Sequence, residues 1–417
     1  MALSLSYPGG PLRGHLTLTG SKSIANRALL IRALTPGGFP IEGLAAADDT
    51  VRMQQLLESS DDTLDCGPAG TTYRFLTAYL CRRQGTQLLT GSARMKERPI
   101  GLLVEALRTL GANIAYAEQE GYPPLRIGYS ALDKSDRVSI AASTSSQYIS
   151  SLLMLAPTLP NGLKLTLEGE IVSLPYIKMT LALMQRFGVR HHWEGQTIIV
   201  APQTYQGSPF TVEADWSAAS YHYSLAALSE EADIQLDGLF EDSLQGDAVV
   251  RKLYAEFGVE TRFTESGVRL TKAAGIAPPA IFEGDFVECP DIAQTLMVSC
   301  AGLGVQGLYS GLQTLAIKET DRVKAMKAEL GKLGIVLFKV PPQMAGSSGA
   351  TFYAQEGRVD FAAAGVPTFG TYHDHRMAMA MAPLALRHAV RIEDPEVVGK
   401  SYPGFWDDLR TLGCEVQ

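Results

Sequence analysis

A glycine repeated at nearly equal intervals is the feature that most limits how this chain can fold. Each copy follows an amphipathic helical stretch ending in Leu or Phe, and each precedes an apolar alternating stretch typical of a strand. The copies are Gly111, Gly188, Gly258, Gly334 and Gly413, at intervals of 77, 70, 76 and 79 residues. Because glycine after the last helical turn supplies a left-handed C-cap, the pattern predicts five units of helix, cap and strand.

A second family of helical stretches alternates with the first. Its members begin near Lys22, Gly70, Ser145, Asp215, Pro290 and Asp374. The chain is therefore predicted to contain six units of about 70 residues, the first shortened around residues 59–62. Each unit combines strands with two helices, which predicts the α/β class. The periodicity alone leaves open how the six units assemble, and a solenoid with an extended binding surface is one alternative.

Composition and charge exclude several classes of protein. With 46% apolar and 19% charged residues in 417, the chain has enough apolar sequence for two or three globular domains. A net charge of −8 argues against a general nucleic-acid or acidic-membrane binder, although it leaves room for a local basic pocket. The N-terminus has no pattern of a signal peptide, and no uncharged stretch has the pattern of a membrane span.

Cysteine usage favours a reducing compartment. The five cysteines are odd in number and form no CxxC pair, so the sequence predicts neither a disulfide framework nor a zinc site. They are Cys66, Cys81, Cys289, Cys300 and Cys414. We therefore expect a cytoplasmic location.

The starts of the second helix family carry hydroxyl, amide and charged side chains. Free N–H groups at a helix start favour a phosphate or a carboxylate, so these positions are candidate anion sites. They contain Lys22, Ser23 and Arg27; Gly70 and Arg74; Thr144, Ser145, Ser146 and Gln147; Asp291; and Asp374, His375 and Arg376. Any one of them could be an ordinary N-cap beside a solvated basic residue. There is no GxxxxGK[ST] or GxGxxG pattern, which argues against a nucleotide site of either kind.

Several ordered motifs together carry a specific resemblance. They include GSKSIANRALL from Gly20, CGPAGTTYRFL from Cys66, STSSQYISSLLM from Ser143, IKETDR from Ile317 and HDHRMAMA from His373. In these segments the chain resembles the enolpyruvyl transferases, and most closely the members that act on shikimate 3-phosphate. The resemblance extends over nearly the whole chain. It implies an inside-out α/β fold of two globular domains, each built from three strand-helix-strand-helix repeats. The expected domains are residues 20–212, and residues 1–19 together with 213–417.

The resemblance also implies a reaction. Such a protein transfers the enolpyruvyl group of phosphoenolpyruvate to the 5-hydroxyl of shikimate 3-phosphate by addition and elimination, and it releases phosphate. The product leads to chorismate and the aromatic amino acids. The resemblance implies no metal, no organic cofactor and no nucleic-acid or membrane partner, and we expect a monomer. Because each substrate carries a phosphate and a carboxylate, the pocket needs several cations, and their mutual repulsion should be strong when it is empty.

Residue roles follow from the resemblance, position by position. Asp291 is expected to be the base, Glu319 the acid, and Lys22 an aid to proton transfer. His375 is expected to be a packing or supporting group more often than a proton carrier. Residues expected to bind shikimate 3-phosphate are Lys22, Ser23, Arg27, Ser145, Ser146, Gln147, Ser173, Tyr176, Asp291, Thr314 and Lys318. Residues expected to bind phosphoenolpyruvate are Lys22, Gly70, Arg98, Gln147, Arg322, Arg376 and Lys400.

The chain departs from the family pattern at four positions, and two other functions remain open. The departures are Pro68 and Phe75 near the start of one helix, and Thr314 and Ala316 before IKETDR. They bear on substrate affinity and on inhibition by glyphosate, which competes with phosphoenolpyruvate in this family. One alternative is the sister activity on UDP-N-acetylglucosamine, which normally uses a loop cysteine as acid. The other is a binding protein that keeps the scaffold without catalysis.

Overall fold

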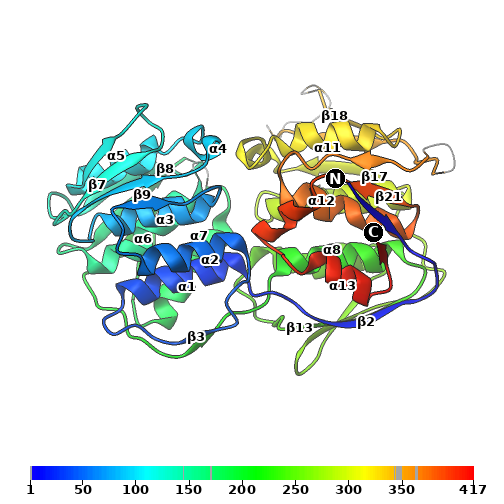
Figure 1. The fold of residues 1–417 in the computed structure, drawn as a ribbon, viewed down its shortest axis with the longest axis horizontal. Coiled ribbons are helices and arrows are strands. Elements are labelled where there is room, and N and C mark those ends of the chain that lie inside the picture. Colours follow the sequence, from blue (N-terminus) through cyan, green and yellow to red (C-terminus); the bar gives the residue numbers. More distant parts are fainter. Residues whose placement is uncertain (1, 144, 170, 342, 344–349, 362–364) are drawn as a thin grey trace. The chain divides into compact units, whose positions relative to one another are not determined.

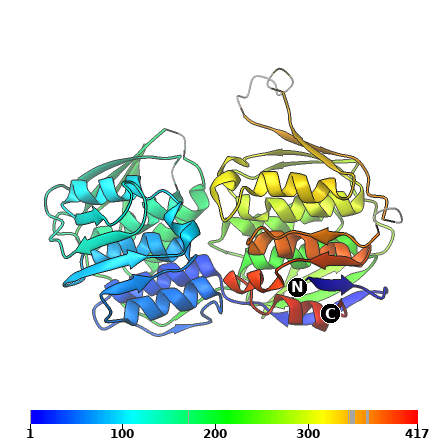
Figure 2. The same ribbon diagram turned by 45° about the horizontal axis from the view of Figure 1, so that its top comes forward.

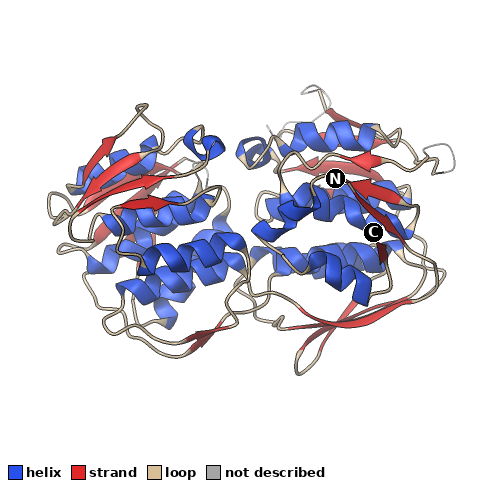
Figure 3. Ribbon diagram, in the orientation of Figure 1, coloured by secondary structure: helices blue, strands red, loops and turns tan. Residues whose placement is uncertain are grey.

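Contacts within the chain separate it into two compact units. The computed structural model describes residues 2–143, 145–169, 171–341, 343, 350–361 and 365–417, so Thr144 lies outside the described residues. Unit 1 contains Met1–Thr19 and Glu213–Gln417, and unit 2 contains Gly20–Val212 (Figure 1). Each unit has its own apolar core. Both units mix helices with sheets, so the predicted α/β class is confirmed (Figure 3).

Unit 2 surrounds its central helices with short strands. Its helices are α1 (Lys22–Leu34), α2 (Asp48–Glu58), α3 (Gly70–Leu80), α4 (Ala93–Lys96), α5 (Gly101–Leu110), α6 (Ser146–Leu155) and α7 (Leu174–Arg186). Its strands are β3 (Ile41–Glu42), β4 (Thr63–Asp65), β5 (Thr86–Thr90), β6 (Asn113–Tyr116), β7 (Leu125–Gly128), β8 (Arg137–Ala141), β9 (Leu163–Glu168), β10 (His192–Glu194), β11 (Thr197–Val200) and β12 (Phe210–Thr211). Helices α1, α3 and α6 bury side chains around most of their circumference, as central helices do.

Unit 1 has the same kind of architecture. Its helices are α8 (Trp216–Leu228), α9 (Val250–Ala255), α10 (Ala293–Leu303), α11 (Arg322–Gly331), α12 (His375–Met381) and α13 (Phe405–Thr411). Its strands are β1 (Leu3–Ser6), β2 (Leu12–Thr17), β13 (Ala232–Asp237), β14 (Glu260–Phe263), β15 (Gly267–Lys272), β16 (Ile281–Asp285), β17 (Gln306–Ser310), β18 (Val336–Lys339), β19 (Tyr353–Glu356), β20 (Thr368–Phe369), β21 (Val390–Ile392) and β22 (Glu415–Val416). Short 3-10 helices carry or precede site residues: η3 (Pro290–Ile292), η4 (Gln313–Ile317) and η7 (Pro395–Lys400).

One sheet topology recurs in the described part of the chain. The orders are β4-β5-β7-β6, β8-β9-β11-β10, β2-β13-β15-β14, β16-β17-β19-β18 and β20-β21-β1-β22. In each sheet the first pair is parallel and the other pairs are antiparallel. A two-stranded parallel sheet of β3 and β12 is the reduced sixth member. The repeat that the glycine spacing predicts is therefore also a repeat of strand order.

The predicted glycine caps are confirmed. Gly111, Gly188, Gly258, Gly334 and Gly413 all have positive φ, between 77° and 106°. Strands β6, β10, β14, β18 and β22 begin within a few residues after these glycines. The six helices of the second family also form, as α1, α3, α6, α8, α10 and α12.

The two ends of the chain meet in one sheet of unit 1. Strand β1 pairs with β21 on one side and with the C-terminal strand β22 on the other, both antiparallel (Figure 2). Strand β2 lies parallel to β13 across six residue pairs. The first 19 residues therefore supply strands to two sheets of unit 1. Among the described residues, no helix combines the length and the apolar character needed to cross a lipid bilayer.

Candidate active site

Hydrogen bonds and an ion pair connect four helix starts in unit 2. Lys22, the first residue of α1, places its Nζ 3.3 Å from Oδ2 of Asp49 at the start of α2. The backbone carbonyl of Asp49 accepts a hydrogen bond from Thr72 Oγ1 on α3. Next to it, Thr71 Oγ1 accepts from Gln147 Nε2 on α6 at 2.9 Å. The sequence motifs at these helix starts are thus parts of one polar cluster.

Arg27 is buried without a carboxylate partner in the part of unit 2 that the structure describes. Its guanidinium donates to Thr180 Oγ1 at 2.7 Å, to Ser150 Oγ at 3.0 Å and to the backbone carbonyl of Ser23 at 2.9 Å. The rings of Phe75 and Tyr176 lie 5.5 and 5.8 Å from its Cζ. Burial lowers the pKa of Arg27 to about 10. A buried cation held only by neutral groups is well suited to receive an anion.

Two more arginines gather around Gly70 at the start of α3. Arg74 Nη1 donates to the backbone carbonyl of Gly70 at 3.1 Å. Burial, followed by the nearby charge of Arg98, lowers the pKa of Arg74 to about 10. A methyl group added at Gly70 would lie 2.6 Å from Arg98 Nη1, closer than real contacts allow. Glycine at this position therefore leaves the space that the two guanidinium groups occupy.

The remaining candidates of unit 2 lie at the starts of α6 and α7. Ser145 caps α6, and its Oγ accepts from the backbone N–H of Gln147 at 3.3 Å, while Ser146 is the first residue of that helix. Ser173 precedes α7 in a left-handed conformation with φ of 56°. Tyr176, in the first turn of α7, lies against Arg27. The structure thus brings Arg27 and Tyr176 together, and it links Gln147 to α3.

Arg322 is the centre of the charged cluster of unit 1. Its side chain is 1% exposed, and its guanidinium contacts three carboxylates. The distances are 2.7 Å from Nε to Asp374 Oδ2, 3.0 Å from Nη1 to Asp291 Oδ1, and 2.9 Å from Nη2 to Glu319 Oε2. Arg322 therefore fixes the relative positions of the predicted base and the predicted acid.

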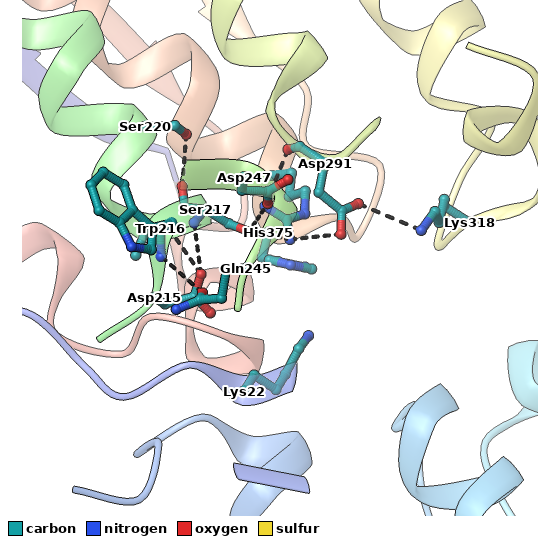
Figure 4. Close-up of polar contacts among 12 residues, drawn as sticks. Lys22, Asp215, Trp216, Ser217, Ser220, Gln245, Asp247, Asp291, Lys318 and His375 are labelled. Atoms are coloured by element: carbon teal, nitrogen blue, oxygen red, sulfur yellow. Dashed lines mark hydrogen bonds and ion pairs between the residues drawn. The ribbon is translucent and has the colours of Figure 1, made fainter. Parts of the chain in front are cut away.

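Each of the two predicted proton carriers also contacts other cations, and Figure 4 shows the contact of Asp291 with Lys318. Asp291 Oδ2 lies 3.1 Å from Arg376 Nη2, and its Oδ1 lies 3.5 Å from Lys318 Nζ. Glu319 Oε1 lies 2.8 Å from Lys400 Nζ. The expectation of unbalanced positive charge is wrong for unit 1, because these carboxylates lie among the cations. An arriving anionic substrate would compete with them for the same guanidinium and ammonium groups.

His375 is buried beside this cluster, at 1% exposure, with its Nδ1 3.6 Å from Asp374 Oδ1. Asp374 caps α12 by accepting from the backbone N–H of Arg376 at 2.9 Å. Thr314 lies on η4 and is half-buried, whereas Ala316 is exposed. In the described residues, no group of three or more His, Cys, Asp or Glu side chains is arranged to hold a metal ion.

Sequence reasoning missed several members of the two clusters. Asp49 and Asp247 are buried carboxylates, and Tyr221 places its hydroxyl 3.3 Å from Arg376 Nη1. Asp49 lies in the first turn of α2, three residues before Arg52, so a search for acidic residues at helix starts could have found it. Asp247 and Tyr221 have no local signal, because their partners lie far away in the sequence.

Asp247 is 5% exposed and accepts a hydrogen bond from Ser217 Oγ. Ser217 Oγ also lies 3.4 Å from Arg376 Nη2. Burial, followed by the charge of Asp291, raises the pKa of Asp247 from 3.8 to about 7. The hydroxyl of Ser217 therefore links Asp247 to the Arg376 guanidinium. The carboxyl of Asp247 holds a proton at mildly acidic pH.

The raised pKa of Asp247 gives an expected pH dependence of stability. Between about pH 4 and 7, folded Asp247 binds a proton that the unfolded chain has lost, so stability falls as pH rises through this window. Asp247→Asn cannot titrate. Urea unfolding would measure the stability of both proteins. The free energy of unfolding of the wild type, minus that of Asp247→Asn, should decrease as the pH rises from 5 to 8. A difference that stays constant or rises with pH would contradict the assignment.

Comparisons with known proteins identify the family of the chain. The family model for EPSP synthase (3-phosphoshikimate 1-carboxyvinyltransferase) matches residues 6–60 and 52–409. A 3-phosphoshikimate 1-carboxyvinyltransferase of Bacteroides fragilis strain YCH46 is 48% identical over 419 residues, covering 100% of this chain and 99% of that relative. One from Bordetella pertussis strain Tohama I is 36% identical over 448 residues, covering 97% and 96%. A solved EPSP synthase from Acinetobacter baumannii has a TM-score of 0.73 at 21% identity, and the match covers 100% of both chains.

The fold and the charged helix starts define an α/β protein of the enolpyruvyl transferase type. The family match and the full-length relatives then make the finer assignment: the chain belongs to the EPSP synthase family. The resemblance seen in the motifs is thereby confirmed. The cysteine-dependent alternative loses support, because Cys66 and Cys81 are fully buried. Burial also raises the pKa of the Cys81 thiol to about 12.

Proposed function

We propose that this protein transfers the enolpyruvyl group of phosphoenolpyruvate to the 5-hydroxyl of shikimate 3-phosphate and releases phosphate. The observation that carries the proposal is the Arg322 cluster. It combines two carboxylates suited to opposite proton roles with cations suited to a phosphate and a carboxylate. Arg27 and Arg74 of unit 2, which are buried and have no carboxylate partner among the described residues, would supply further anion sites.

The two substrates would use different groups of residues. Shikimate 3-phosphate would contact Lys22, Ser23, Arg27, Ser145, Ser146, Gln147, Ser173, Tyr176, Asp291, Thr314 and Lys318. Phosphoenolpyruvate would contact Lys22, Gly70, Arg98, Gln147, Arg322, Arg376 and Lys400. Arginine suits these roles because its planar fork binds a carboxylate or a phosphate through two parallel hydrogen bonds. Phe75 supports the first group through its ring contact with Arg27.

The reaction needs a base, then an acid. Asp291 accepts the proton of the 5-hydroxyl while the oxygen of that hydroxyl bonds to C2 of phosphoenolpyruvate. Glu319 donates a proton to the methylene carbon. The product of this addition is a tetrahedral ketal that still carries phosphate. Elimination then returns a proton from the new methyl group to the Glu319 carboxylate and breaks the C2–O bond to phosphate, which restores the double bond. Lys22 assists these proton transfers and neutralises the leaving phosphate.

Phosphate release tests the proposed function. The purified protein is incubated with phosphoenolpyruvate and either shikimate 3-phosphate or UDP-N-acetylglucosamine. Release only with shikimate 3-phosphate is expected. Release only with UDP-N-acetylglucosamine would assign the sister activity, and release with neither acceptor would favour a binding protein.

We further propose that units 1 and 2 are the two domains of the enzyme, and that it acts as a cytoplasmic monomer without nucleic-acid or membrane partners.

Gly70→Ala should weaken binding of phosphoenolpyruvate and of glyphosate. The new methyl group would displace the Arg98 guanidinium, which is the flexible end of a side chain, so we expect little loss of stability. The KM for phosphoenolpyruvate should rise about tenfold, the effect of losing one charged hydrogen bond. Glyphosate inhibition should weaken at least as much. Gly331→Ala is the control, because nothing lies near its added methyl group. An unchanged KM and an unchanged glyphosate inhibition constant would contradict this role of Gly70.

A further inference from the structure

Two consecutive residues with left-handed backbones precede Asp374. Tyr372 and His373 have φ of 55° and 57°, and neither is glycine. Residues other than glycine rarely adopt this backbone conformation, because it brings Cβ too close to the following carbonyl oxygen. Such a pair persists only where surrounding contacts hold it. The turn leads directly into Asp374, which contacts Arg322, and into Arg376, which contacts Asp291.

Glu329, in the last part of α11, holds this turn from the side. Its carboxylate is 1% exposed and accepts from Tyr372 Oη at 2.6 Å and from the backbone N–H of Gly370 at 2.9 Å. Lys332 Nζ balances the charge of Glu329 at 2.6 Å, and it also donates to the backbone carbonyl of Thr368 at 2.9 Å. Burial, then the hydrogen bond to Glu329, raises the pKa of Tyr372 to about 12, so its hydroxyl remains a donor.

The same helix holds the segment at a second point. Arg322 begins α11 and bonds Asp374, whereas Glu329 lies two turns later and bonds Gly370 and Tyr372. The left-handed pair begins at Tyr372, which Glu329 holds, and ends immediately before Asp374, which Arg322 holds. Because the second attachment sets the path of the turn, it sets where Asp374 caps α12 and where the Arg376 side chain begins.

We propose that Glu329 and Tyr372 form a latch that positions Asp374 and Arg376, and thereby tunes the affinity of the unit 1 cations for an anion. The latch touches no reacting atom in this assignment, so both are positioning residues. The identity of the anion, phosphoenolpyruvate or the phosphate released from it, rests on the proposed function. The latch itself requires only that these cations bind a phosphate-bearing anion.

Tyr372→Phe is the main test, because it keeps the ring and removes only the hydroxyl. Tyr309→Phe is its control, since the hydroxyl of Tyr309 on strand β17 donates to Gln355 on strand β19 of unit 1. Three quantities are measured for each variant: the KM for both substrates with kcat, the calorimetric affinity for inorganic phosphate with shikimate 3-phosphate present, and the thermal unfolding midpoint. For Tyr372→Phe, phosphate affinity should fall and the KM for phosphoenolpyruvate should rise, each about tenfold. The KM for shikimate 3-phosphate and kcat should change much less.

Glu329→Gln provides a second variant in case Tyr372→Phe fails to fold. Its amide oxygen can still accept from Tyr372, but its NH₂ would face the N–H of Gly370, so we expect the same pattern of changes. If Tyr372→Phe and Glu329→Gln bind phosphate as tightly as Tyr309→Phe does, the latch is overturned, even if the unfolding midpoints of the two variants fall. A wild-type protein that binds no phosphate would also overturn it. Phosphate release by the wild type, assayed separately, decides the proposed function whatever the variants do.

Discussion

Replacing Asp291 by asparagine is expected to lower kcat about a hundredfold or more, the usual effect of losing a general base. The amide oxygen of the new side chain could still accept a hydrogen bond from Arg322, so the cluster should keep its shape. The neutral amide would no longer offset the charges of Arg376 and Lys318, and anionic substrates should therefore bind as well as before. Steady-state kinetics with both substrates would show a fall in kcat without a rise in either KM.

The matched control is Asp285→Asn. Asp285 is an exposed carboxylate that accepts from Ser310 Oγ at 2.8 Å, and it ends the strand that precedes η3. Its replacement should leave kcat within about twofold, as expected for a surface position. Wild-type turnover in Asp291→Asn would remove Asp291 from the mechanism. A large rise in KM with normal kcat would instead assign it to substrate binding alone.

Arg322→Met should destabilise the protein by about 3–5 kcal/mol, the usual cost of breaking a buried ion pair by removing one partner. Arg322 is 1% exposed and contacts Asp291, Glu319 and Asp374. Without it these carboxylates repel one another across a site that excludes much of the solvent. Methionine fills a similar volume, so the change isolates the charge and its hydrogen bonds. The free energy of unfolding from urea titration would measure the loss.

Arg410→Met provides the comparison on the surface. Arg410 bonds Asp407 at 2.6 Å, and their side chains are 48% and 80% exposed. Such exposed pairs contribute about 1 kcal/mol or less, because water screens them. Equal losses in the two variants would mean that burial of the Arg322 cluster contributes nothing. Arg322→Lys should be intermediate, because an ammonium group cannot contact all three carboxylates with the geometry of a guanidinium.

Much of the local structure could be predicted from the sequence, because local structure depends on residues a few positions apart. The five capping glycines and the six helices of the second family follow from spacing and apolar periodicity alone. Helix starts that bear Lys22, Gly70, Gln147 and Arg376 are also visible as candidate anion sites. The sequence also shows the positions at which the chain departs from its family. It does not show that one of them, Phe75, contacts Arg27.

Only the tertiary structure decided which charges meet. Arg322 pairs with Asp374 at a separation of 52 residues, and Arg27 bonds Thr180 at a separation of 153. Strand β1 lies between β21 and β22 from the far end of the chain. The sequence could count cations but not the carboxylates beside them, so it predicted repulsion in unit 1 where the structure has balance. The physical reason is that a helix cap is set by its neighbours along the chain, whereas burial, ion pairing and the pKa of Asp247 depend on what folding brings near in space.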